Sequence, residues 1–134
     1  MEPEAMRNRV FNPTLQRLLE RKDSLVEIGK IERSGFQGWL KVEVITALAN
    51  KGQPVKALTN RSPHILLEWD FGLDVEAMTD LNIRLILDRE VYCLFLGDGS
   101  DDKRATLLSN RRVVCHEVFS DGVNCWVLGL LKPP

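Results

Sequence analysis

Glu43 is the residue in the sequence best placed to do acid–base or metal chemistry. It falls between Trp39 and Ala47, at the edge of the apolar stripe that Phe36 and Leu40 begin on an expected helix. A carboxylate in that position is partly desolvated, so it needs an arginine, a backbone donor or a metal ion as a partner. Two interpretations follow from this position: a functional carboxylate, or a boundary glutamate in a structural ion pair, which is the commoner case.

Charge is unevenly distributed along the 134 residues, although 18 basic and 19 acidic side chains give a net charge of only −1. Residues 68–90 contain seven acidic and two basic residues, whereas residues 1–22 and 101–112 each carry a net charge of +2. The acidic stretch could hold a divalent cation and the basic segments could contact phosphates, although opposed surface charges more often pair within the fold. The basic segments make nucleic acid a candidate partner. The candidate binding residues are Trp69, Arg104, Arg111 and Arg112.

The hydropathy pattern predicts helices followed by strands. Apolar residues recur at helical spacing over 12–29 and 34–51, and Gly52 is expected to end the second helix. Beyond it, the alternation predicts a hairpin over 81–96, in which Leu87 pairs with Glu90, and a second hairpin around Ser120-Asp121-Gly122. Residues 55–58 and 64–69 are weaker strand candidates, and residues 70–79 read as a loop or a short helix. The expected fold class is α+β, with N-terminal helices packed on a mostly antiparallel sheet of about five strands.

Length and composition favour one domain over residues 1–134, with residues 1–11 as a flexible basic arm. No secretory signal and no bilayer-length apolar run are present in the sequence, so no membrane partner is expected. Cys93, Cys115 and Cys125 have no close spacing, which is typical of reduced thiols and not of a metal site. These features predict a cytoplasmic location.

The order of the carboxylates resembles that of a known family. Glu43 on a helix, followed by Asp80 directly before the strand Leu81-Asn82-Ile83-Arg84-Leu85, resembles the PD-(D/E)xK nuclease-like core over residues 35–97. The resemblance implies that Glu43 and Asp80 are catalytic and that they hold Mg²⁺ or Mn²⁺. The family's acid-x-Lys pair is missing from residues 90–96, so Glu68 or Asp70 with Lys103 would have to replace it.

The leading functional prediction is a small cytosolic, non-enzymatic binding or interaction protein that self-associates, most simply as a homodimer. No complete catalytic constellation or cofactor motif occurs in the sequence; for example, Cys115 and His116 are strand neighbours whose side chains point to opposite faces. Two apolar hairpins, in contrast, leave sheet edges that must be covered. The alternative is a divergent metal-dependent nuclease or nucleic-acid-binding relative that uses Glu43 and Asp80.

Overall fold

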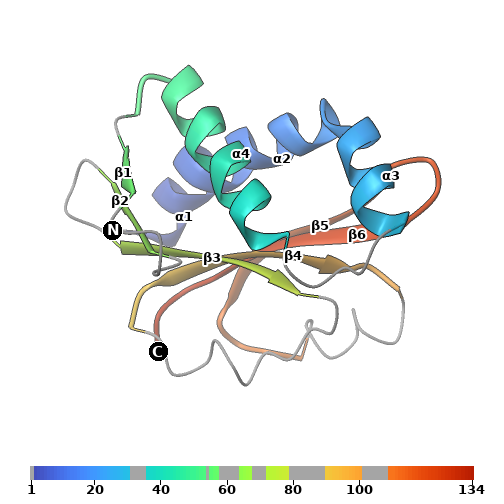
Figure 1. Cartoon of the computed structure of the whole chain (residues 1–134). Coiled ribbons are helices and arrows are strands. Elements are labelled where there is room, and N and C mark those ends of the chain that lie inside the picture. Colours follow the sequence, from blue (N-terminus) through green and yellow to red (C-terminus); the bar gives the residue numbers. More distant parts are fainter. Residues whose placement is uncertain are drawn as a thin grey trace.

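A computed structural model describes residues 2–30, 36–53, 55–57, 64–67, 72–78, 90–100 and 109–134 of the chain. Helices come first and strands follow, as Figure 1 shows. The elements are α1 (Pro3–Met6), the π-helical segment η1 (Arg7–Phe11), α2 (Asn12–Leu19), α3 (Lys22–Lys30), α4 (Gln37–Asn50), β1 (Val55–Ala57), β2 (His64–Leu67), β3 (Gly72–Met78), β4 (Tyr92–Asp98), β5 (Val113–Ser120) and β6 (Cys125–Leu131). The expected α+β class is confirmed.

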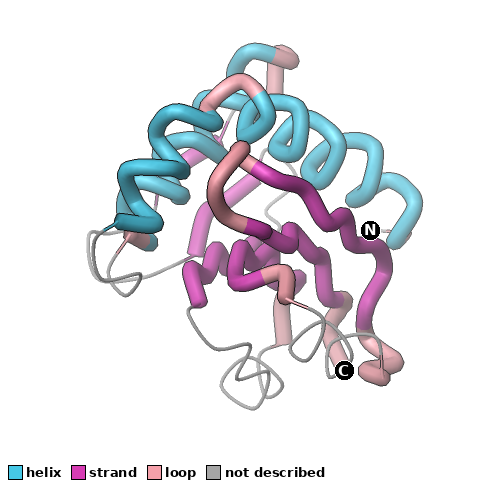
Figure 2. The backbone as a smooth tube through the Cα atoms, turned by 90° about the vertical axis from the view of Figure 1, so that its right-hand side faces the viewer, coloured by secondary structure: helices cyan, strands magenta, loops and turns pink. Residues whose placement is uncertain are grey.

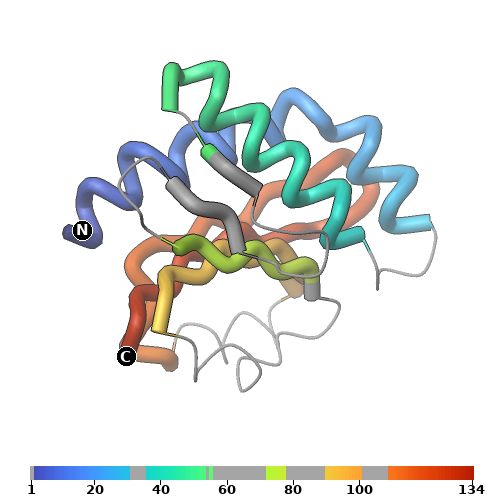
Figure 3. The backbone as a smooth tube through the Cα atoms, turned by 60° about the vertical axis from the view of Figure 1, so that its left-hand side comes forward, coloured from blue at the N-terminus to red at the C-terminus, as the bar shows by residue number. Residues whose placement is uncertain are grey.

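The N-terminal segment is helical where a flexible basic arm was expected. Met6, Val10 and Phe11 are buried in the core, and their spacing places them on one helical face. Figure 3 shows these first helical segments lying on the same side of the sheet as α4. Polar and charged residues, Arg7 and Arg9 among them, separate the apolar positions, so the face that packs on the core is not obvious from the composition of this segment.

The helix expected over residues 12–29 is two helices, α2 and α3. The backbone N–H of Glu20 bonds to the carbonyls of both Gln16 and Arg17, which tightens and ends the last turn of α2. The stop of α4 is as predicted: Gly52 has φ +73°, a left-handed conformation that glycine adopts without a steric penalty. None of the helices in the described ranges is long and apolar enough to cross a membrane.

The strands form one mixed sheet in the order β1-β2-β3-β4-β6-β5. Within the described ranges it has six strands, where the sequence suggested about five, and of the described pairs only β3 and β4 run parallel. The predicted second hairpin is present as β5 and β6, with Gly122 at φ +101° in its turn. The mostly antiparallel character is therefore confirmed, with the parallel pair as an addition.

The hairpin expected over residues 81–96 is not the pairing that β4 makes. One edge of β4 is bonded to β3, with Leu73 opposite Tyr92, and the other is bonded to β6, with Cys93 opposite Leu131. Both hydrogen-bonding edges of β4 are therefore occupied; residues 81–89 lie outside the described residues. Strand β3 occupies part of the region where a loop or short helix was expected.

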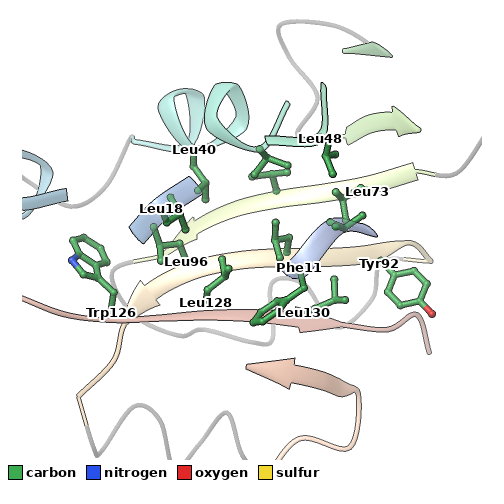
Figure 4. Packing of buried hydrophobic residues seen from close by; sticks show 14 of the residues in the cluster. Phe11, Leu18, Leu40, Leu48, Leu73, Tyr92, Leu96, Trp126, Leu128 and Leu130 are labelled. Atoms are coloured by element: carbon green, nitrogen blue, oxygen red, sulfur yellow. The ribbon is translucent and has the colours of Figure 1, made fainter. Parts of the chain in front are cut away.

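The helices cover one face of the sheet, as Figures 1 and 2 show, and the main core lies between the two layers. Figure 4 shows Leu18 and Leu40 from the helices facing Leu96 and Leu128 from the strands. The ring of Trp126 is fully buried and meets Phe36 edge to face, with centroids 5.9 Å apart. A smaller apolar cluster occupies the opposite face of the sheet: Cys93, Phe95, Val127 and Leu131.

Candidate functional site

Glu43 lies between α2 and α4, and its partners are arginines. Its Oε2 accepts a hydrogen bond from Arg17 Nε at 2.6 Å, and Arg21 Nε lies 3.5 Å from the same oxygen. Glu43 is 7% exposed, as the helical wheel predicted for the edge of an apolar stripe. Arg17 reaches the carboxylate from α2, and Arg21 reaches it from the turn between α2 and α3.

This arrangement fixes two helices to each other. A charge-assisted hydrogen bond of 2.6 Å with limited access to water is a strong contact, and it joins residues 26 positions apart in the sequence. A cation that bound Glu43 Oε2 would have to displace Arg17 from it. A small cavity of about 130 Å³ opens nearby and is lined by Pro13, Gln16, Arg17, Glu20, Ala47, Asn50 and Lys51. Within the part of the chain that the structure describes, no three His, Cys, Asp or Glu residues gather as a metal site would need.

We expect Glu43→Ala and Arg17→Ala each to lower the free energy of unfolding by about 1–3 kcal/mol, because each leaves a partly buried charge without its partner. The double variant should lose less than the sum of the two single losses. Urea unfolding of all four proteins measures this coupling. Glu27→Ala is the control, because the ion pair of Glu27 with Lys30 is exposed on both sides and its loss should change stability by less than about 1 kcal/mol. Additive effects of Glu43→Ala and Arg17→Ala would contradict the structural role of the pair.

Of the other candidate site residues named from the sequence, Arg111 and Arg112 belong to the described part of the structure. Asp80, Trp69 and Arg104 lie outside the described residues. Arg111 and Arg112 precede β5 at the border of the sheet, where the backbone N–H of Arg112 bonds to Asn110 Oδ1 at 2.9 Å. Glu43 belongs instead to the helical layer.

Sequence reasoning missed Asp74, a fully buried carboxylate on β3. Leu73 and Val75 belong to the core under the helices, so Asp74 and Glu76 are on the opposite face of the sheet. The register places Asp74 between His64 on β2 and Cys93 on β4. The alternation of Leu73, Asp74, Val75 and Glu76 is the sequence signal that could have identified this strand and its buried acid.

The outer border of the sheet at β5 is the second feature with functional potential. β5 has eight residues, and its carbonyl at Val114 accepts a hydrogen bond from Arg7 Nη2 at 3.2 Å. A bulge between Val113 and Cys115 interrupts the register there. Burial raises the pKa of the Cys115 thiol, an effect that a hydrogen bond and the charge of Arg7 partly offset.

Three features of the described structure have functional potential: the paired Glu43, the buried Asp74 and the border strand β5. Each is an arrangement of this chain's own residues, and each allows a different role: a structural contact, a carboxylate site and a docking edge. Comparison of the chain with protein-family models, with curated proteins and with solved structures gave no match.

Proposed function

We propose that this protein is a non-enzymatic binding protein that self-associates by pairing β5 with β5 of a second copy. The observation that carries the proposal is the difference between the two borders of the sheet. One border is β1, with three residues, and the other is β5, with eight. Very short edge strands are one of the ways in which proteins prevent pairing with another chain, and β5 does not use it.

The composition of β5 also favours pairing. The strand contains valine and phenylalanine, no proline and no lysine, and its one acidic residue is Glu117. Among the described residues, β5 pairs with β6 alone. The bulge and the Arg7 contact interrupt the edge only at Val113 and Val114. Residues 115–120 are left as a regular stretch about 20 Å long, at roughly 3.4 Å per residue.

Two copies of β5 can pair antiparallel about a two-fold axis perpendicular to the sheet. In that arrangement the helices of both copies lie on the same face, and the two sheets become one. Val118 and Phe119, which are only partly buried in the single chain, would then lie in the middle of a continuous sheet. Burial of their remaining apolar surface, together with the new backbone hydrogen bonds, supplies the driving force.

We expect the wild-type chain to behave as a dimer of twice 15.3 kDa in light scattering coupled to size exclusion, and Val118→Lys to behave as a monomer. A lysine at this partly buried position can extend its charged end to water in the monomer, but it would have a neighbouring strand on both sides in the dimer. Val123→Lys is the matched control, because Val123 is 74% exposed in the β5–β6 turn, beyond the end of the edge. A monomeric wild type at every concentration, or a dimeric Val118→Lys, would exclude the proposal.

Hydrogen exchange of the wild-type chain tests the β5–β5 pairing without a variant. Amides of residues 115–120 that point away from β6 should exchange more slowly as the protein concentration rises, whereas those of the buried strand β4 should not change. Protection that is independent of concentration would count against pairing at this edge.

The contacts of Glu43 support a binding role more than the nuclease alternative. In that alternative Glu43 and Asp80 hold Mg²⁺ or Mn²⁺, so the carboxylate must be open to a metal ion. In the structure, Glu43 Oε2 bonds to Arg17 and lies beside Arg21. The alternative therefore requires the α2–α4 contact to open first, which a docking edge on β5 does not.

A further inference from the structure

A pocket between α3 and the first turn of α4 is separate from both Glu43 and the β5 edge. It has a volume of about 370 Å³ and is lined by Asp23, Ser24, Glu27, Ile28 and Trp39. The volume falls within the roughly 300–1,000 Å³ range of pockets that bind small groups. We call it the α3–α4 pocket.

The inner wall of the α3–α4 pocket is apolar. Ile28 is buried in the core, and Trp39 packs against the same core while part of its ring stays accessible. Most of the accessible lining surface is carbon. An indole face beside an aliphatic side chain is a surface on which the methylene stem of a long side chain can lie.

The rim of the pocket is acidic. Asp23 and Glu27 are four residues apart on α3, so their carboxylates stand on the same side of the helix. None of the described residues that line the pocket is basic. Lys30 Nζ donates to Glu27 Oε1 at 2.9 Å, which shows within this chain that the rim accepts an ammonium group. That pair is exposed on both sides, so an incoming cation can replace it at little cost.

Carboxylates above an aromatic wall are the chemistry that selects an extended cation. An indole face attracts a guanidinium or ammonium group, and the two carboxylates complement its charge. We propose that the α3–α4 pocket binds an arginine or lysine side chain from a basic peptide segment of a partner protein. The stem of that side chain lies along Ile28 and Trp39, and its charged end meets Asp23 and Glu27.

The test uses a fluorescein-labelled peptide of alternating arginine and leucine, measured by anisotropy against the full chain. A second peptide carries citrulline in place of arginine, which keeps the shape and removes the charge. Asp23→Asn/Glu27→Gln should weaken binding of the arginine peptide at least about tenfold, and Trp39→Leu about threefold to thirtyfold. The matched control is Glu20→Gln/Glu90→Gln, which removes the same charge from exposed positions outside the pocket and should stay within about twofold of the wild type.

Trp39→Phe is a second variant for the case in which Trp39→Leu does not fold. It keeps an aromatic wall in the pocket and should retain part of the affinity for the arginine peptide. Equal binding of the citrulline peptide would overturn the proposal, as would an equal loss in the control variant. Binding by the Val118→Lys protein should match the wild type, since this pocket does not depend on the β5 edge.

Discussion

Asp121→Ala should lower the free energy of unfolding by about 3–5 kcal/mol, because one carboxylate accepts four hydrogen bonds and one of them is buried. Oδ1 accepts the backbone N–H groups of Val123 at 2.7 Å and Asn124 at 2.6 Å. Oδ2 accepts Trp126 Nε1 at 2.8 Å and Asn124 Nδ2 at 3.1 Å. The indole is fully buried, so its N–H would lose its partner without gaining water. Urea unfolding at pH 7 measures the loss.

The same carboxylate predicts a pH dependence. Burial raises the pKa of Asp121, but the hydrogen bonds from Asn124, Trp126 and Val123 outweigh it and lower the pKa below the ordinary 3.8. A lowered folded-state pKa means that the stabilisation is complete above the unfolded value. It is then lost as the pH falls through the folded value. The stability difference between wild type and Asp121→Asn, which keeps the side-chain shape without the charge, should therefore shrink below about pH 3.8. A difference that does not change down to pH 3 would contradict this assignment.

Asp121 also connects stability to the proposed function. It closes the turn between β5 and β6, and β6 is the strand that holds β5 in the sheet. Loss of the turn should therefore loosen the strand edge on which self-association depends. We expect Asp121→Ala to weaken dimerisation at concentrations where most of the chain is still folded, which sedimentation over a concentration series would show.

The sequence predicted those elements whose ends are set by residues close together in the chain. The β5–β6 hairpin follows from Ser120-Asp121-Gly122, and the end of α4 follows from Gly52. β3 was not predicted, because Asp74 and Glu76 give an acidic composition to a strand that is half apolar. The parallel pairing of β3 with β4 was also not predicted, because parallel strands are joined by a long crossover connection and not by a local turn that the sequence could reveal.

At the candidate site, too, the sequence predicted the local feature and not the contact between elements. The burial of Glu43 is a property of one helix, and its periodicity predicts it. The identity of its partner depends on how α2 packs against α4, and nothing in the spacing of Arg17 and Glu43 encodes that contact. Met6 and Val10 were overlooked for a related reason, because intervening arginines mask their helical spacing.

The second large loss of stability is expected from a substitution at Gly129, on the face of the sheet opposite the helices. Gly129 lies across from Phe95 in the β4–β6 register. A methyl group at position 129 would overlap Cζ and Cε1 of the fully buried Phe95 ring. A buried ring has no free space to turn into, so Gly129→Ala should lower the free energy of unfolding by about 2–3 kcal/mol. The better strand propensity of alanine offsets less than about 1 kcal/mol of this.

The cause of that loss can be separated from a general intolerance of position 129. Phe95→Leu shortens the overlapping group, so the double variant Gly129→Ala/Phe95→Leu should be about as stable as Phe95→Leu alone, with a coupling energy of roughly 1–3 kcal/mol. Gly38→Ala is the control, because a methyl group there meets no atom within 4 Å, and on a helix it should be neutral or stabilising by up to about 1 kcal/mol. If Gly129→Ala stays equally destabilising in the Phe95→Leu background, the overlap with the ring is not the reason. The glycine would then be needed for its backbone between β4 and β5 instead.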